Sequence, residues 1–430
     1  MTERNISCHE IIVRLGVFRA LYASAVFFNS VLFRLIVGVL AISSGVPVDT
    51  VALVTLIEFS LNGILEVPFG ILADRMGRVP SIALCLGTIM TGLTCVYIAL
   101  LIHNDFSRVL FIIHGILIGL AKPFSSGSIE AFYQDALHRA CQTEEEKKLL
   151  LTSLTTSQNH GKYYTTIAVL CAFVLAAIFN QMHLLPHTFL FGIILYAGCF
   201  VTLLRDYRQI GDIEKTLHPS SPFAIIKALV TDRSARISSI YNLSYWMISV
   251  VIAGYLIISL GREYEGDNFL RWAFMVSFML GSAFGGAVKG HILPLLVHKL
   301  SRGKYLLTFY VLTLLSSLAF LPLYQHSNAV IQIIYIFVYG ALLNTATSAI
   351  QNISMNDLMS LVKKQDYATA LSFQNIPGYL WVGAYSTYLT LFRGGTPSVR
   401  EAFVTVIVFS IIFSLTVIFV ERDSFRSEIK

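Results

Sequence analysis

Ionisable side chains interrupt long apolar runs in the first third of the sequence, at Arg34, Glu58, Glu66, His114 and Lys122. Charged groups in such runs are costly unless they are paired, so they usually mark a functional site. Glu58 has two candidate cationic partners, Arg34 and Lys122. Low dielectric raises the pKa of a carboxylate and a neighbouring cation lowers it, so the group can exchange a proton when its partner moves. We therefore expect Glu58 to be the first candidate for proton exchange and His114 the second.

Depth along the helix supports treating these residues as one group. With a rise of about 1.5 Å per residue, Lys122 lies almost at the middle of its apolar run, whereas Glu58 lies roughly 5 Å outward of the middle of its own. Glu58 and Glu66 are eight residues apart, so they face much the same side of one helix. Two structural readings stay open beside the functional one. In the first reading, Arg34 and Glu58 form a fixed bridge that sets helix register. In the second, His114 is a core histidine with satisfied hydrogen bonds.

The second half of the sequence carries fewer buried charges and more amides and aromatic rings. Asn242, Tyr245 and Trp246 share one helical face, and Asn344 lies on a later apolar run. Lys289 either holds an anionic group or extends its ammonium to the membrane interface. We expect these five residues to take part in substrate binding, with interface anchoring as the alternative for the two aromatic ones. The six cysteines lack metal-ligand spacing, so no metal or other cofactor is expected.

Composition predicts that lipid is the solvent for much of this protein. The chain has 430 residues, of which 55% are hydrophobic and 13% are charged, and its mean hydropathy is +0.70. Soluble domains have about 45–50% apolar and about 25% charged residues. The net charge of +6 does not indicate a nucleic-acid partner, because the basic residues lie in short loops between apolar runs. The fold class is therefore expected to be an all-α integral membrane protein.

The apolar runs predict twelve transmembrane helices, because a spanning helix needs about 20 mostly apolar residues. A polar stretch divides them into two groups of six, as in a two-half transporter. We expect an N-terminal half over 1–204, a cytoplasmic linker over 205–235 and a C-terminal half over 236–430. The predicted spans lie near 15–42, 48–73, 80–102, 108–136, 160–181, 185–204, 237–260, 269–298, 304–323, 329–357, 367–391 and 399–420.

The distribution of lysine and arginine predicts the orientation in the membrane. If the N-terminus is cytoplasmic, the inner segments hold 21 basic residues and the outer segments hold 5. Cytoplasmic loops carry such an excess of positive charge. The asymmetry supports an even number of spans and places both termini in the cytoplasm.

The loop between the second and third predicted spans reads GILADRMGR, residues 70–78. Its glycines permit close approach and a tight turn, its aspartate can end one helix and cap the next, and its arginines can pair with neighbouring carboxylates. The stretch resembles the loop motif G-x-x-x-D-R-x-G-R-[RK] of the major facilitator superfamily, with valine in place of the last basic residue. The resemblance implies a conformational latch on the cytoplasmic side. Its expected members are Glu66, Gly70, Asp74, Arg75, Gly77 and Arg78.

Other stretches resemble the drug and metabolite permeases of this superfamily. They are EVPFGILAD at 66–74, SSGSIEAFYQDAL at 125–137 and YATALSFQN at 367–375. The fifth span lacks the G-P-x-x-G-G motif of drug/proton antiporters. The second-half copy of the loop, LSRGK at 300–304, has no aspartate and predicts a weaker latch.

The resemblance implies a monomeric secondary transporter that moves a small organic solute by alternating access. We expect proton-coupled efflux or permease activity in the bacterial cytoplasmic (inner) membrane, and no enzyme activity. One alternative is an anionic metabolite such as a carboxylate siderophore or organic acid, because Arg34, Lys122 and Lys289 outnumber Glu58 and Glu66 within the spans. A second alternative, a membrane enzyme or non-transporting sensor, lacks the sequence motifs that catalysis would need.

Overall fold

The protein is helical throughout the part that the structure describes. The computed structural model describes residues 48–102, 104–125, 185–210, 222–256, 300–323, 328–362, 367–393 and 397–421, with isolated positions between 17 and 26, 128 and 132, and 259 and 288. The first elements are α2 (Val48–Met76), α3 (Arg78–Ile102), α4 (Asp105–Ser125), the 3-10 turn η1 (Leu185–His187) and α7 (Thr188–Ile210). The later ones are α8 (Pro222–Thr231), α9 (Arg233–Val250), the π-helical turn η3 (Val251–Leu256), α12 (Arg302–Leu323), α13 (Ala329–Leu361), α14 (Tyr367–Phe392) and α15 (Val399–Val420).

Six helices of the described part are long and apolar enough to cross a membrane. Their outer faces carry stripes of exposed apolar side chains; on α15 the stripe includes Val404, Ile411, Leu415 and Phe419. Contiguous apolar surface of this kind fits lipid rather than water. The predicted spans near 15–42, 160–181 and 269–298 fall largely outside the described residues, so the number twelve stays a prediction. The six are Leu53–Ala73, Arg78–Ile102, Phe106–Ser125, Arg302–Pro322, Ala329–Met355 and Val399–Val420.

Helices α9 and α14 occupy the seventh and eleventh predicted spans and are not among these six helices. Asn242 on α9 and Gln374 on α14 are almost completely buried, as are Ser238 and Ser372. Polar side chains at membrane depth normally face other helices. α14 packs against both α9 and α2, so it connects the C-terminal helices to the N-terminal ones.

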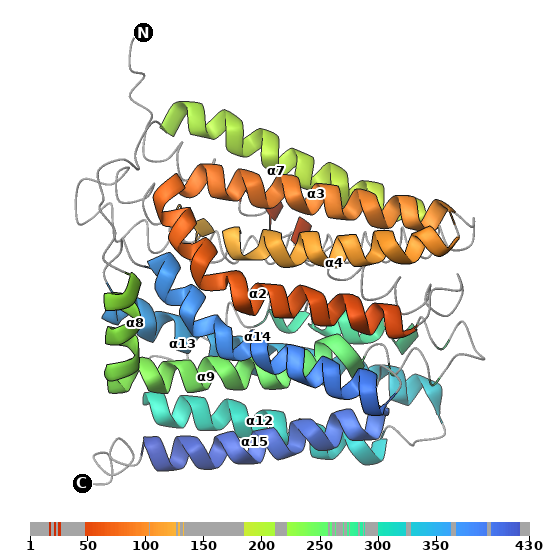
Figure 1. The fold of residues 1–430 in the computed structure, drawn as a ribbon. Coiled ribbons are helices and arrows are strands. Elements are labelled where there is room, and N and C mark those ends of the chain that lie inside the picture. The colour runs from red at the N-terminus through yellow and green to blue at the C-terminus, as the bar shows by residue number, and fades with distance from the viewer. Residues whose placement is uncertain are drawn as a thin grey trace.

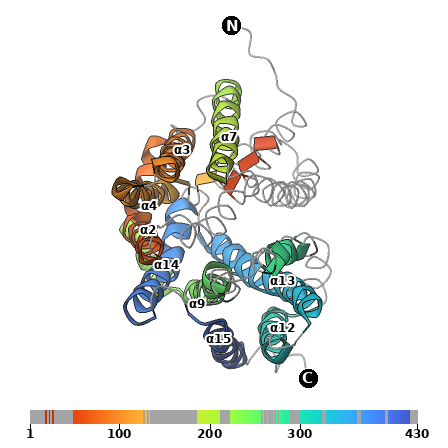
Figure 2. The same cartoon turned by 90° about the vertical axis from the view of Figure 1, so that its right-hand side faces the viewer.

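The long helices lie side by side, and α8 crosses one end of them (Figure 1). Viewed from the end of the bundle, α2, α3, α4 and α7 form one group and α9, α12, α13 and α15 another, with α14 beside α2 (Figure 2). We call the end that carries Arg75, Arg78, Arg233 and Arg302 the basic end. It is the end that the positive-inside rule assigns to the cytoplasm, and the position of the two termini stays a prediction.

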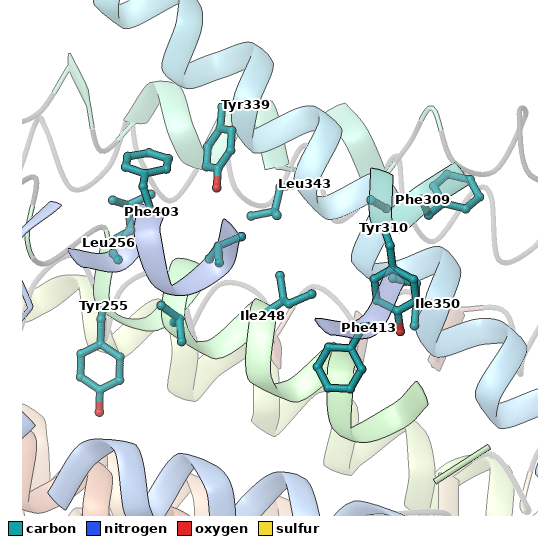
Figure 3. Close-up of a cluster of buried hydrophobic side chains, with 14 of the residues drawn as sticks. Ile248, Tyr255, Leu256, Phe309, Tyr310, Tyr339, Leu343, Ile350, Phe403 and Phe413 are labelled. Carbon is teal, nitrogen blue, oxygen red and sulfur yellow. The ribbon is translucent and has the colours of Figure 1, made fainter. Parts of the chain in front are cut away.

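Each group of helices has its own hydrophobic core. The core of the second group is rich in aromatic rings: Tyr339 and Phe403 lie 5.1 Å apart between ring centroids, and Tyr310 and Phe413 lie 5.9 Å apart. Figure 3 shows these two pairs at opposite ends of the cluster. Phe59 of α2 is the N-terminal residue that joins this second core. α2 therefore inserts an aromatic side chain into the C-terminal group.

The junction between α2 and α3 is a single residue, Gly77. Its φ of 98° lies in the left-handed region that favours glycine, and its N–H donates to the carbonyl of Ala73 over 3.0 Å. The expectation that Asp74 ends a helix is wrong, because α2 continues through Asp74 to Met76. The following helix starts directly at Arg78, so Gly77 makes the turn by itself.

The predicted linker at 205–235 is helical at both ends. α7 runs on to Ile210, and α9 begins at Arg233 with Asp232 as its N-cap, whose side chain accepts from the Ala235 N–H over 2.9 Å. Between them, α8 buries Leu229 against residues from the ends of α13 and α14. The linker helix is thus attached to the C-terminal group at the basic end.

Candidate substrate and coupling site

Glu58 and Lys122 form an ion pair that joins α2 to α4. Of the two cations expected for Glu58, the structure places Lys122 beside it, whereas Arg34 lies outside the described residues. The Glu58 side chain is 11% exposed and that of Lys122 is 40% exposed. The pair is neutral as a whole, and its cation is the more accessible member.

Close packing of α2 and α4 brings this pair together. A Cβ atom added to Gly119 would lie 2.8 Å from the Leu61 Cβ and 3.0 Å from the Glu58 carbonyl oxygen. One turn earlier, a Cβ atom on Gly115 would lie 3.0 Å from the Val54 carbonyl oxygen. Small residues at such spacing let helix backbones approach closely. The two glycines therefore set the distance across which Lys122 reaches Glu58.

Aromatic rings lead from the ion pair into the C-terminal group. The Lys122 ammonium lies 5.1 Å from the centroid of the Phe59 ring, a cation–π distance. Phe59 lies 6.2 Å from Tyr379, Tyr379 lies 4.9 Å from Trp246, and Trp246 lies 5.6 Å from Tyr245. We call Phe59, Tyr379, Trp246 and Tyr245 the aromatic row. It draws on α2, α14 and α9, so both groups of helices contribute to it.

Of the predicted face of Asn242, Tyr245 and Trp246, the first and the last reach the same residue of α14. The Asn242 amide donates to the Asn375 Oδ1 over 3.1 Å and to the Gln374 carbonyl over 3.0 Å. The Trp246 Nε1–H points to the same Asn375 oxygen at 3.4 Å. These contacts orient the indole ring at the end of the aromatic row. The role of the face in substrate binding stays a prediction.

One layer nearer the basic end, three buried polar residues connect α9, α13 and α14. Ser238 donates to the Ser354 carbonyl over 2.6 Å, and Ser354 donates back to the Ser238 carbonyl over 2.7 Å. The Gln374 amide donates to both hydroxyl oxygens, over 2.7 and 2.8 Å. Buried polar groups that are satisfied in this way specify one arrangement of their helices. The cluster therefore fixes the packing of α9, α13 and α14 next to the site.

His114 lies in the core of the N-terminal group and is 3% exposed. Its Nδ1–H donates to the Gly92 carbonyl of α3 over 3.0 Å. Glu58 and Lys122 both act on its ring electrostatically. His114 thus neighbours the ion pair and also makes a structural hydrogen bond.

Asn344 joins α13 to the segment at 276–282. Its amide nitrogen donates to the Ser282 carbonyl over 2.5 Å, and its Oδ1 accepts from Ser348 over 3.1 Å. These bonds engage both ends of the amide in contacts between and within helices, and the predicted role of Asn344 in substrate binding stays a prediction. Lys289 lies outside the described residues, and its predicted role is untested.

Of the residues expected to form the latch, Glu66 and Gly70 lie where α2 meets α14. A Cβ atom on Gly70 would lie 3.0 Å from the Ser372 Oγ of α14. Glu66 is completely buried and acts electrostatically on Tyr379. Arg75 is exposed and Arg78 is buried, whereas the side chain of Asp74 is outside the description. A latch function for these residues stays a prediction.

The second-half loop at 300–304 takes part in a charge network, although its sequence matches the loop motif poorly. Arg302 pairs with Asp357 of α13 at 2.8 Å and with Glu421 after α15 at 3.6 Å. Tyr241 of α9 donates to the same Glu421 carboxylate over 3.1 Å, and its ring lies 5.7 Å from the guanidinium. Four C-terminal helices therefore meet at Arg302, although the loop has no aspartate of its own.

Sequence reasoning missed Phe59, Tyr379 and Asn375. The spacing of Asn375 and Tyr379, four residues apart on one predicted span, is the signal that could have indicated them. In the part of the chain that the structure describes, no group of three or more histidine, cysteine or acidic residues is placed to hold a metal ion.

The fold resembles those of solved transporters. The nucleoside transporter NupG is 12% identical with a TM-score of 0.66, and the match covers 95% of this chain and 98% of that one. A bacterial homologue of the iron transporter ferroportin, in an outward-facing state, is 14% identical with a TM-score of 0.66 over 96% and 99% of the two chains. The human organic anion transporter MFSD10 (TETRAN) is 12% identical with a TM-score of 0.59 over 94% and 99%. At these identities the likeness shows the fold alone.

The family follows from the sequence profile. No curated protein sequence matches the chain at a significant level. The profile of the Major Facilitator Superfamily matches residues 20–387, which is most of the chain. Its members are multi-pass membrane transporters of small molecules rather than enzymes. The chain therefore belongs to the major facilitator superfamily.

Proposed function

We propose that this transporter moves a small organic solute by alternating access and couples that movement to protons through Glu58. The observation that carries the proposal is the Glu58–Lys122 ion pair beside the aromatic row. A charged pair inside a membrane bundle is costly, and residues of this kind commonly mark substrate and proton pathways. Here the pair lies where helices of both groups meet, and these groups must move relative to each other in alternating access.

The coupling step follows from competition for Lys122. While Glu58 faces the ammonium, its carboxylate is paired with Lys122. When a solute or a helix movement separates the two groups, the buried carboxylate loses its counter-ion and binds a proton instead. Return of Lys122 releases that proton. Glu58 therefore exchanges a proton once in each cycle.

Helix α2 is suited to transmit this step. It carries Glu58 at the ion pair, Phe59 in the aromatic row and Gly70 against Ser372 of α14. Opening the basic end would separate Gly70 from Ser372, and α2 connects Gly70 through Pro68 to the other two residues. We propose the residues at 66–78 as a latch that holds this end closed.

The substrates named for the similar structures differ: nucleosides, iron and organic anions. They support a solute transporter and do not select one solute. We further propose a monomer in a bacterial cytoplasmic membrane, with lipid around its apolar stripes, working as an exporter or a permease. The alternative of a non-transporting sensor is an outcome of the same experiment.

The test uses purified protein in liposomes that contain a pH-sensitive dye. A panel of neutral, cationic and anionic solutes is added outside, with and without an imposed pH gradient, and both solute uptake and internal pH are followed. We expect one class of solute to drive proton movement in the wild type and to lose it in Glu58→Gln. Glu263→Gln, at an exposed position, is the matched control and should behave like the wild type. Unchanged proton coupling in Glu58→Gln would refute the proposal, and absence of flux for every solute would favour the sensor.

A further inference from the structure

We propose that the solute is a planar aromatic anion and that it crosses the membrane together with one proton, as an electrically neutral pair. This inference rests on the proposed function and adds the chemical class and the stoichiometry to it. Three observations carry it: the N–H donors of Lys122 that no described residue engages, the neutrality of the ion pair, and the aromatic row.

The Lys122 ammonium has more N–H donors than its hydrogen bond to Glu58 uses. An ammonium group carries three N–H donors, and within the described residues Glu58 is the hydrogen-bond partner of this one. The Lys122 side chain is 40% exposed, while the Glu58 side chain is 11% exposed. An anion can therefore approach the lysine without first displacing the carboxylate. A neutral solute would gain less from these donors, because it lacks the charge–charge attraction to the ammonium that a carboxylate has.

The ammonium lies among residues of several helices. Glu58 and Phe59 come from α2, and buried Cys85 of α3 lies near enough for Lys122 to act on its thiol electrostatically. The neighbouring Ser125 of α4 donates its hydroxyl to the Lys122 carbonyl over 2.9 Å. Because α2 contacts the ammonium directly and α3 lies within its electrostatic reach, we place its exposed donors inside the bundle.

Charge balance then requires a proton. The empty site contains Lys122⁺ and Glu58⁻ and is neutral, so adding one anion would leave a net negative charge in a medium of low dielectric. Such a charge is costly, and the cost disappears when Glu58 takes one proton from solution. In this step an O–H bond forms on Glu58, and no bond of the solute changes. On the opposite side the anion leaves, Glu58 releases the proton, and the ion pair reforms. The empty and the loaded carrier thus have the same net charge.

The other groups that face Glu58 do not replace it in this exchange. His114 of α4 and Tyr379 of α14 are within electrostatic reach of the carboxylate. His114 donates its Nδ1–H to the Gly92 carbonyl. Glu66, on the same helix as Glu58, acts on Tyr379 from the side of the basic end. Among these groups Glu58 is the one that contacts the lysine, so its charge is the one that a bound anion replaces.

The aromatic row indicates the shape of the anion. Phe59 lies against the ammonium, and Tyr379, Trp246 and Tyr245 continue from it at centroid distances of 4.9 to 6.2 Å. Phe59 and Tyr379 are buried, whereas Trp246 and Tyr245 keep accessible surface. A flat ring gains from offset or edge-to-face contact with such side chains beyond the area that it buries. An aliphatic anion gains the area alone.

The experiment measures binding and proton uptake by the purified full-length protein in detergent, with three probes of similar size. They are 2-naphthoate, which is planar and anionic, decahydro-2-naphthoate, which is anionic and not aromatic, and 2-naphthamide, which is planar and neutral. We expect 2-naphthoate to bind roughly tenfold more tightly than the saturated acid and roughly 10–100-fold more tightly than the amide. In weakly buffered solution with a pH dye, about one proton should be taken up for each 2-naphthoate bound.

Variants separate the two halves of the inference. Glu58→Gln should bind 2-naphthoate without proton uptake, and Lys122→Gln should lose binding by roughly 10–100-fold. Lys227→Gln and Glu263→Gln change exposed residues away from the site and should retain both properties. If Lys122→Gln does not yield folded protein, Lys122→Arg should retain binding and the double variant Glu58→Gln/Lys122→Gln should lose it.

Several results would overturn the inference. Equal binding of the two acids would contradict the preference for an aromatic ring. Equal binding of 2-naphthamide and 2-naphthoate would contradict the preference for an anion. Binding without proton uptake in the wild type would contradict the coupled proton. Absence of binding for all three probes also counts against the class of solute. The proposed function survives these failures if liposome flux of another solute still depends on Glu58, and it fails separately if proton coupling is intact in Glu58→Gln.

Discussion

Gly378 of α14 lies so close to Trp246 of α9 that a Cβ atom at position 378 would overlap the indole ring. The ring also contacts Tyr379 at 4.9 Å and points its Nε1–H to Asn375 at 3.4 Å. α14 therefore holds Trp246 on three sides, through a backbone surface, an aromatic ring and an amide oxygen. Because α14 also packs along α2, this ring lies next to the contact between the two groups of helices.

The first prediction concerns this contact. Gly378→Ala should displace the Trp246 ring, because neither α14 nor α9 can withdraw without breaking the Asn242–Asn375 bond of 3.1 Å. We expect a loss of stability of about 1–3 kcal/mol, the usual cost of overpacking, and weaker solute binding. Thermal unfolding and tryptophan fluorescence measure these effects. Gly198→Ala on α7 is the control, because nothing lies within 4 Å of its added Cβ; equal effects of both changes would contradict the prediction.

The second prediction concerns the stability of the Glu58–Lys122 pair. Removing one partner leaves a charge without its counter-ion, which costs about 3–5 kcal/mol for a fully buried pair. Since Lys122 is 40% exposed, we expect about 1–2 kcal/mol for either single variant, Glu58→Gln or Lys122→Gln. The double variant should recover part of this loss. Unfolding of the four proteins gives the coupling energy, and additive losses would show that the pair does not stabilise the fold.

The third prediction concerns the contact between α2 and α14 at the basic end. A Cβ atom on Gly70 would lie 3.4 Å from the Ser372 Cβ, close to the separation of about 3.5–4.5 Å found in disulfides. In a protein whose six cysteines have been replaced, Gly70→Cys/Ser372→Cys should form a disulfide. We expect the oxidised protein to lose transport and the reduced protein to regain it. Transport that continues in the cross-linked protein would contradict a latch at this contact.

The fourth prediction concerns pH and the network around Arg302. Asp357 lies beyond the span Ala329–Met355; burial raises the pKa of its carboxyl above the usual 3.8, Arg302 opposes this shift and Glu421 adds to it. A carboxyl with a raised pKa favours the folded state when protonated. Its contribution is therefore complete below about pH 4 and is lost as the pH rises through the raised value. The stability of Asp357→Asn relative to the wild type should therefore be greater at neutral pH than at acidic pH.

Arg302 itself should matter more than either acid. Arg302→Gln leaves Asp357 and Glu421 facing each other without the cation, whereas Asp357→Asn leaves Arg302 paired with Glu421. We expect the first change to lower the unfolding temperature more than the second at neutral pH. Unfolding measured between pH 4 and pH 8 tests both statements, and a larger loss in Asp357→Asn would contradict them.

The fifth prediction separates His114 from Glu58. His114→Gln should lower the free energy of unfolding by about 1 kcal/mol, because it weakens the hydrogen bond to the Gly92 carbonyl. That carbonyl belongs to the helical backbone of α3. Proton uptake for each bound solute should stay the same as in the wild type, because the imidazole does not contact the anion site in this proposal. A loss of proton uptake in His114→Gln, with solute binding intact, would transfer the coupling role to this histidine.

Several features of the protein were readable from local sequence. Helical apolar runs, the GILADRMGR loop and the shared face of Asn242 and Trp246 depend on residues near each other along the chain. Hydropathy over about 20 residues decides whether a helix can enter lipid, and a period of 3.6 decides which side chains share its face. For this reason the membrane class, the family resemblance and most helix positions were predicted. The end of α2 was not, because Gly77 alone makes the turn that Asp74 was expected to begin.

The partners of the site residues were decided by tertiary structure alone. Glu58 had two candidate cations in the sequence. Lys122, 64 positions away, reaches it because Gly115 and Gly119 let α4 pack against α2, and Arg34 lies outside the described residues. The aromatic row needed the relative rotation of α2, α9 and α14, and the Arg302 network needed the ends of α13 and α15 to meet. Hydropathy acts on each helix separately and leaves its rotation and neighbours open. Side-chain packing between helices removes that freedom, and it does so only when the whole bundle is assembled.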